Sequence, residues 1–259
     1  SKSIASNINV AAMFSGKAEK EEIMVDDGIG KVQIWRVEEF KRVPIPPEQY
    51  GELFASESYV IQYSYIWKNK DCYLLYFWQG RTSSIIGKGT SACLTIELDD
   101  KMKGTAAMSK EVRVVQGKEP KHFLSVFKGK MIVHKGHDPK GQAGSAAPSE
   151  NGTRLYQIRG KEISARAMET LSSAHSLNSS NAFVAVTSTT CFLWFGKFSN
   201  EHERGLAMNI SKNSSLHRDS IVEILEGKEP SAFWDALGGH KPYPTEHQTM
   251  RRDPRLFQC

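Results

Sequence analysis

The same four residues, GKEP, occur twice in this chain of 259 residues, at Gly117–Pro120 and at Gly227–Pro230. Each copy is followed by an apolar segment. Each is also preceded by an aromatic run that ends in glycine, at residues 72–80 and 191–196. A repeated order of segments at a fixed spacing indicates a duplicated structural unit. The chain is therefore predicted to contain two copies of one fold.

Both repeats show the same predicted order of elements. A first strand, at residues 32–37 and 154–159, precedes two apolar strands of a central hairpin, a long helix, a further strand and a short helix after GKEP. The strand segments are rich in β-branched and aromatic residues, as buried strands are. We expect an α/β (α+β) fold in which each repeat has a mixed β-sheet between one long and one short helix.

Composition changes along the chain predict the domain boundaries. We expect a linker at 1–25, a first repeat at 26–138, a Gly-, Ser- and Pro-rich linker at 139–152, a second repeat at 153–243, and a linker with the start of a further repeat at 244–259. We therefore expect this chain to be part of a longer protein.

The overall composition excludes several classes of protein. Hydrophobic residues make up 39% of the chain and aromatic residues 10%, enough for a core in each repeat. The 34 basic and 29 acidic residues are interspersed, which favours a protein or lipid-headgroup partner over nucleic acid. The apolar runs are too short for a spanning helix, and the widely spaced cysteines predict free thiols in the cytosol. We expect no enzyme, because no nucleophile–base pair, paired carboxylates or phosphate loop accompanies the repeats.

The predicted long helix of the first repeat has two apolar sides at about 100° per residue. One side consists of Leu94, Leu98 and Met102. The roughly opposite side consists of Ala92, Cys93 and Ile96, continued by Asp99 and Asp100. One side can pack on the sheet, while the other contacts a partner or is covered by a neighbouring repeat. Because Gly87 and Gly89 weaken the first turn, we expect this helix to begin near Thr90.

Five longer segments carry a more specific pattern. They are VDDGIGKVQIWRV (25–37), YLLYFWQG (73–80), VVQGKEPKHFLSVFKGKMIVHKG (114–136), SLNSSNAFV (176–184) and EGKEPSAFWDALGG (226–239). These segments resemble the villin/gelsolin family of actin-binding proteins. Their order is similar to the fourth and fifth of six repeats, and Pro254–Phe257 is similar to the opening of the sixth. Met24–Gly28 and Leu193–Lys197 are most similar to the villin-like branch.

The resemblance implies actin binding as part of a cytoplasmic, cytoskeletal protein that severs, caps or bundles filaments. Actin and the neighbouring repeats are the implied partners. The implied actin-binding residues are Ala92, Cys93, Ile96, Asp99 and Asp100, with Leu94, Leu98 and Met102 in the core. The alternative is a supervillin-like interaction scaffold that retains the fold without productive actin contact.

Calcium is the cofactor that the resemblance implies, at three kinds of position. At the internal site of the first repeat stand Glu57 and Gly87, so we expect this degenerate site to be empty and calcium regulation to be weak or absent. The second repeat offers Asn181 and Glu203 for a weak site, although Asn200 and Glu203 also have the spacing of a helix cap. A site shared with actin would use the Asp99 carboxylate and the carbonyls of Gly104 and Ala106.

A basic cluster follows the first GKEP segment. It includes Lys118, Lys121, Lys128 and Lys130. The resemblance implies polyphosphoinositide headgroups as ligands, while a solvated charged face is the other interpretation of such a run.

Overall fold

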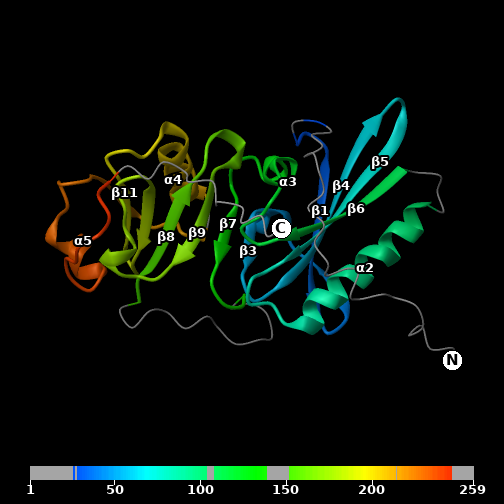
Figure 1. Ribbon diagram of the computed structural model, residues 1–259, viewed down its shortest axis with the longest axis horizontal. Coiled ribbons are helices and arrows are strands. Elements are labelled where there is room, and N and C mark those ends of the chain that lie inside the picture. The colour runs from blue at the N-terminus through cyan, green and yellow to red at the C-terminus, as the bar shows by residue number, and fades with distance from the viewer. Residues whose placement is uncertain (1–25, 27, 104–107, 139–151, 214, 247–259) are drawn as a thin grey trace, which may run out of the picture. The chain divides into compact units, whose positions relative to one another are not determined.

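The computed structural model describes residues 26, 28–103, 108–138, 152–213 and 215–246. The chain forms two compact units (Figure 1). Unit 1 comprises the described residues up to Pro44 together with 58–126, and unit 2 comprises 45–57 and the described residues from Phe127 onward. Among the described residues, no helix combines the length and hydropathy that a membrane crossing requires.

Unit 1 contains a five-stranded sheet in the order β2-β1-β4-β5-β6. Its elements are β1 (Lys31–Glu38), β2 (Lys41–Pro44), β4 (Ser58–Trp67), β5 (Lys70–Gln79), α2 (Ile85–Lys103), β6 (Met108–Val115) and α3 (Lys121–Val126). The pairing of β5 with β6 is parallel, and the other three are antiparallel. A parallel pair needs a crossover connection, and α2 provides it. The helix lies along β4, β5 and β6 (Figure 1).

Neighbouring residues of a strand point to opposite faces of the sheet. Consecutive residues of β5 are buried, so both faces of the sheet of unit 1 are covered. On one face, Leu75 of β5 packs with Leu94 and Leu98 of α2. On the other face, Tyr76 packs edge-on against Phe123 of α3, with ring centroids 5.2 Å apart. The prediction that Leu94 and Leu98 belong to the core is confirmed.

Unit 2 contains a seven-stranded sheet in the order β12-β11-β10-β8-β9-β7-β3. Its strands are β3 (Glu52–Phe54), β7 (Ile132–His134), β8 (Arg154–Arg159), β9 (Arg166–Thr170), β10 (Ala182–Val186), β11 (Thr190–Phe195) and β12 (Ser220–Leu225). Its helices are η1 (Pro47–Gln49), η2 (Glu162–Ser164), η3 (Ala174–Ser176), α4 (Glu201–Asn213) and α5 (Ser231–Ala236).

Two separate cores cover the faces of this second sheet. Ile210 of α4 belongs to the cluster that includes Val184 and Leu193. Phe233 of α5 belongs to the cluster that includes Phe183 and Trp194. The predicted fold class, a mixed sheet between one long and one short helix, is therefore confirmed in both units.

The repeated GKEP segment has one structural role in both units. Glu119 and Glu229 each accept a hydrogen bond from the indole nitrogen of a buried strand tryptophan, at 3.3 Å from Trp78 and 2.8 Å from Trp194. Each glutamate also accepts from the amide of the glycine two residues earlier, at 2.9 Å. That glycine has a φ of 90° in the first copy and 84° in the second, a conformation that favours glycine. The motif that identifies the repeats is thus a structural clamp.

The second sheet incorporates two short strands from within the predicted first repeat. β3 pairs in parallel with β7, and β7 in parallel with β9. His134 of β7 contacts side chains of two other strands of this sheet. Its Nε2 lies 3.1 Å from Glu52 Oε2 on β3, and its Nδ1 lies 2.9 Å from the Tyr156 hydroxyl on β8. The compact units therefore differ from the predicted boundaries, 26–138 and 153–243, in the placement of 45–57 and 127–138.

Candidate functional site

Helix α2 begins at Ile85 and contains 19 residues, so the prediction of a start near Thr90 is wrong. Ser84 caps the helix: its Oγ accepts a hydrogen bond of 2.9 Å from the amide of Gly87. A hydroxyl at this position satisfies an amide that lacks a partner within the helix. At Gly89, a Cβ would face open space. The serine cap and the sheet beneath the helix outweigh the low helix propensity of two glycines.

The buried side of α2 is broader than its apolar residues indicate. Ser91 and Thr95 have no exposed surface. Their burial is tolerated because each hydroxyl donates a 2.8 Å hydrogen bond to a helix carbonyl, from Ser91 to Lys88 and from Thr95 to Ser91. These two polar residues shift the centre of the buried side toward Ala92 and Asp99, which are 4% and 2% exposed. The prediction that Ala92 and Asp99 lie on the outward side is therefore wrong.

The outward side of α2 carries an apolar stripe that begins before the predicted residues. We define the outer apolar stripe as Ile85, Ile86, Gly89, Cys93 and Ile96, which share one side at about 100° per residue. Ile85 and Ile86 are 82% and 66% exposed, whereas Cys93 and Ile96 are half-buried. Asp100 is exposed beside the stripe. The predicted helix start near Thr90 leaves these two isoleucines outside the helix, and the structure places them in its first turn.

Asp99 lies buried at the end of α2 nearest to β6. Its Oδ2 forms an ion pair with Lys103, one turn later, whose side chain is 62% exposed. Its Oδ1 is buried and has no hydrogen-bond partner within the described ranges, which omit 104–107. Burial alone would raise the pKa of Asp99, but the bond to Lys103 lowers it overall. Burial and the charge of Asp99 raise the pKa of Glu111 on β6.

The predicted calcium site shared with actin is only partly described by the structure. Gly104 and Ala106 lie outside the described residues. The unpartnered oxygen of Asp99 fits a hard cation, which binds carboxylates, while Lys103 already neutralises the second oxygen. No group of three or more His, Cys, Asp or Glu side chains within the described part of the chain is arranged to hold a metal ion.

The internal site of the first repeat has its two predicted positions in different surroundings. Glu57 belongs to unit 2, where its Oε1 lies 2.7 Å from Nδ1 of His137. Gly87 belongs to unit 1, and a Cβ there would lie 3.3 Å from the Ser83 hydroxyl. Glu57 therefore already has an intramolecular partner, and Gly87 brings no side chain. An empty site remains a prediction.

In the second repeat, Glu203 is 2% exposed and already surrounded by donors. Its Oε1 accepts from Asn181 Nδ2 at 2.9 Å and from the amide of Gly160 at 3.2 Å. Its Oε2 accepts from the amide of Asn200 at 3.3 Å, and Asn200 Oδ1 accepts from the amide of Glu203 at 3.0 Å. Burial outweighs these bonds and raises the pKa of Glu203. The two residues form a reciprocal capping box, and a weak calcium site here remains a prediction.

The four lysines proposed for headgroup binding are all exposed. Lys118 and Lys121 belong to unit 1, and Lys128 and Lys130 to unit 2. Their interpretation as a phosphoinositide site remains a prediction.

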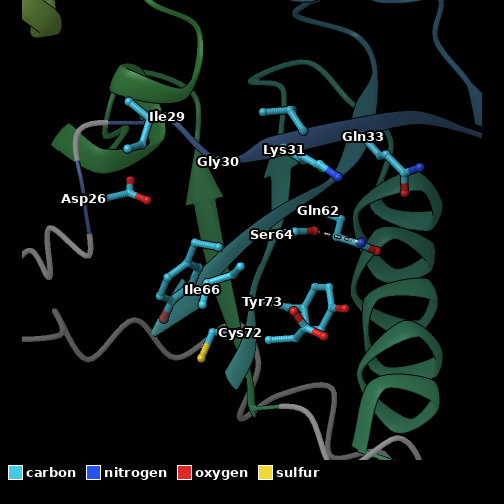
Figure 2. Close-up of a pocket in the computed structure, with 13 residues that line it drawn as sticks. Asp26, Ile29, Gly30, Lys31, Gln33, Gln62, Ser64, Ile66, Cys72 and Tyr73 are labelled. Carbon is cyan, nitrogen blue, oxygen red and sulfur yellow. Dashed lines mark hydrogen bonds between the residues drawn. The ribbon is translucent and has the colours of Figure 1, made fainter. Parts of the chain in front are cut away.

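A cavity of about 960 Å³ lies in unit 1, beside residues 26–33 and strands β4 and β5. Figure 2 shows its lining from β1, β4 and β5, including Lys31, Gln62 and Tyr73. Asp26 also lines the cavity, and its Oδ1 accepts hydrogen bonds from the Tyr63 hydroxyl, the Gly28 amide and His122. The predicted site residues do not contribute to this lining. Asp26 instead ties the start of unit 1 to its sheet and to α3.

Three comparisons with known proteins bear on identity. A family model described as the gelsolin repeat matches residues 39–124. Gelsolin of Gallus gallus is 40% identical over 243 residues, which are 91% of this chain and 30% of that protein. This chain therefore spans less than a third of the length of that relative.

Two solved structures are similar at low TM-scores. A chain of the Thorarchaeota 2DGel3/rabbit actin complex is 17% identical with a TM-score of 0.33, covering 80% of this chain and 99% of that one. A chain of the Thorarchaeota ProGel/rabbit actin complex is 26% identical with a TM-score of 0.29, covering 33% of this chain and 99% of that one. Scores of this size do not establish a shared overall arrangement.

Proposed function

This chain belongs to the gelsolin family, and from that premise we propose that it binds actin through the outer apolar stripe of α2. The family is non-enzymatic, so the proposal concerns a binding surface. The observation that carries it is the exposure of Ile85 and Ile86 on a helix whose opposite side already packs on its own sheet. The proposal includes a cytoplasmic, cytoskeletal location and a parent protein that severs, caps or bundles filaments.

Hydrophobic burial supplies the affinity in this proposal. Covering an exposed isoleucine side chain completely contributes about 1.5–3 kcal/mol before the entropic cost of association. Ile85 and Ile86 are largely exposed, and the half-buried Cys93 and Ile96 continue the surface along the helix. Asp100 lies at the polar edge of this surface, where a charge contributes to orientation more than to affinity.

Weak calcium regulation is the second part of the proposal. Two carboxylates expected at internal sites already have protein partners: Glu57 is paired with His137, and Glu203 caps α4. A metal would have to compete with these bonds. Calcium at an actin-shared site formed by Asp99, Gly104 and Ala106, and headgroup binding by the four exposed lysines, belong to the same proposal.

Substitution along the stripe tests the actin contact. We expect Ile96→Asp and Ile86→Asp each to weaken binding to monomeric actin at least about tenfold, equivalent to about 1.4 kcal/mol. The matched control is Ile66→Asp, on the β4–β5 hairpin, where the isoleucine is 75% exposed. Fluorescence anisotropy of labelled actin measures the affinity, and circular dichroism checks the fold.

Each outcome of this experiment has a distinct meaning. Loss of binding in the two helix variants, with the hairpin control unchanged, supports the stripe as the contact. Equal binding by all variants and the unsubstituted chain contradicts it. Failure of the unsubstituted chain to bind actin would favour an interaction scaffold that retains only the fold.

A further inference from the structure

The β4–β5 hairpin extends beyond the other strands of its sheet (Figure 1). Among the described residues, β1 pairs with β4 no further toward the tip than Ser64, and β6 pairs with β5 no further than Cys72. From there the two strands pair with each other up to a turn at Lys68 and Asn69. Both turn residues have a positive φ, 49° and 61°, as a tight two-residue hairpin turn requires. The tip is therefore a narrow ribbon that projects from the sheet.

The projecting ribbon carries two large apolar side chains. Ile66 is 75% exposed and Trp67 is 48% exposed. Because successive strand residues point to opposite faces, these side chains lie on the two faces of the ribbon. Turns and their flanks are normally polar, so the hairpin does not need these residues in order to form in water. Adjacent apolar side chains at a projecting tip indicate a surface that contacts something apolar.

Lysines surround the apolar side chains of the tip. The Lys68 ammonium lies 4.3 Å from the centre of the Trp67 ring, and Lys70 lies directly opposite Trp67 in the strand register. Lys31 lines the cavity beside the hairpin (Figure 2). All three lysines are exposed, and the acidic residue closest to them in the hairpin is Asp71. The tip therefore combines a net positive charge with exposed apolar groups.

We propose that this hairpin tip inserts into the headgroup region of an anionic lipid bilayer. Trp67 and Ile66 enter the interface, while the lysines remain at the level of the lipid phosphates. Tryptophan is enriched at membrane–water interfaces because its ring is apolar and its indole nitrogen seeks a polar partner. A lysine stem can lie along apolar surface while its ammonium stays with the phosphates. Each lysine close to an anionic surface strengthens binding about fivefold.

A bilayer fits the shape of the tip better than a protein partner does. The two apolar side chains lie on opposite faces of a narrow ribbon, and a bilayer interface surrounds such a ribbon on all sides. A protein with an acidic surface would have to enclose the ribbon in a cleft. The inference goes beyond the proposed function and does not depend on the actin contact, since it uses a different part of unit 1.

The β1–β2 turn shows why exposure of an aromatic residue alone is not sufficient. Phe40, in this turn at the opposite end of β1, is 69% exposed. Its neighbours are Glu39 and Lys41, whose charges cancel, so the turn offers no net attraction to an anionic surface. The two turns of one sheet therefore form a matched pair for an experiment.

Sedimentation of the full chain with lipid vesicles tests the proposal. We expect binding to vesicles of phosphatidylserine and phosphatidylcholine, weaker binding to phosphatidylcholine alone, and loss of this difference at high salt. Trp67→Gln should weaken binding at least about tenfold, because an apolar ring no longer leaves water. Lys70→Gln should weaken it about fivefold. The controls Phe40→Gln and Lys41→Gln, in the β1–β2 turn, should bind like the unsubstituted chain.

Quenching of tryptophan fluorescence by brominated phosphatidylcholine in the same vesicles identifies the inserted side chain. Trp78 and Trp194 have no exposed surface and should not be quenched. Trp67→Phe keeps an apolar ring, so it should still bind the vesicles but should lose most of the quenching. The other tryptophans are the same in both chains, so the difference between them isolates Trp67. Circular dichroism checks that each variant is folded.

Three results would overturn the proposal. They are failure of the unsubstituted chain to bind the phosphatidylserine vesicles, equal weakening by Trp67→Gln and Phe40→Gln, and quenching that persists in Trp67→Phe. The vesicles contain no phosphoinositide and the assay contains no actin. A failed actin contact therefore leaves the vesicle result unchanged, and failed insertion of the hairpin leaves the actin titration unchanged.

Discussion

The long helices of the two units occupy the same place in the repeat but differ in what they leave exposed. α4 begins with Glu203 in a capping box, and its residues Leu206, Ala207 and Ile210 form one buried side. α2 has no acidic residue in its first turn, begins on a serine cap and exposes Ile85 and Ile86. The same structural position therefore supports a helix that serves its own domain in unit 2 and a helix with a second, outward apolar side in unit 1.

The clamp formed by the GKEP segments, which follow β6 and β12, on the tryptophans of β5 and β11 shows what the two units keep in common. The Trp78–Glu119 and Trp194–Glu229 bonds join the same pair of residue types at equivalent positions, at 3.3 Å and 2.8 Å. The units keep this clamp although their sheets have five and seven strands, and substitutions in both units can test what they share and where they differ.

The largest expected difference is in the free energy of unfolding, between a substitution on the buried side of α4 and one on the exposed side of α2. Ile210→Ala, at a position 2% exposed in α4, should lower the free energy of unfolding by about 2–5 kcal/mol because it leaves a cavity. Ile86→Ala in α2 should change it by no more than about 0.5 kcal/mol, because that side chain is 66% exposed. Urea denaturation measures both. A large loss for Ile86→Ala would mean that the outer apolar stripe is part of a core.

The next difference concerns the strands β3 and β7, which extend the sheet of unit 2. Burial raises the pKa of Glu52, but hydrogen bonds from His134 and the Ser215 amide outweigh it and lower the pKa from 4.5 to about 2. The ionised carboxylate therefore stabilises unit 2 above pH 4.5, and this contribution is lost as the pH falls toward 2.

The measurement compares the unsubstituted chain with Glu52→Gln across this pH range. The difference in unfolding free energy should be on the order of 3 kcal/mol at neutral pH and should shrink as the carboxylate protonates. The transition of unit 1 should not change. A difference that is independent of pH would show that the charge of Glu52 does not hold these strands in place.

The smallest expected effect tests the feature that the units share. Glu119→Ala and Glu229→Ala should each cost about 1–3 kcal/mol, because each leaves the indole nitrogen of a fully buried tryptophan without its acceptor. Exposed Glu97→Ala on α2 is the control. Tryptophan fluorescence during denaturation follows the change, and clearly unequal costs in the two units would contradict an equivalent clamp.

Much of the fold could be predicted from the sequence because its signals are local. The apolar runs of β5 and β11, the repeated GKEP segment and the spacing of Leu94 and Leu98 each reflect a period or a motif that can be read within a few residues. These patterns predict the order of the elements and the packing of each long helix on its sheet.

The strands β3 and β7 could not be predicted in the same way. Each has three residues, too few for a period, and each pairs in parallel with a segment that is distant in the sequence. Their position depends on the buried contact of His134 with Glu52 and Tyr156, which only the folded chain brings together.

The candidate site was predicted in part, with an error in the direction of α2. Counting only apolar residues left out Ser91 and Thr95, whose hydroxyls bond within the helix and allow burial. The apolar pattern therefore places Ala92 and Asp99 on the outward side and does not include Ile85 and Ile86. The Ser84 cap is a recognisable signal for the true start, since serine is favoured at this position.

Protection of Cys93 from alkylation tests the central claim most directly. This free thiol is half-buried on the outer apolar stripe, whereas Cys72 and Cys191 are buried in the cores and serve as internal references. The chain carrying Cys259→Ser would be alkylated with and without saturating monomeric actin, and the modified peptides quantified by mass spectrometry. We predict that actin slows the modification of Cys93 at least tenfold. An unchanged rate at Cys93 in a chain that demonstrably binds actin would place the contact elsewhere and contradict the account.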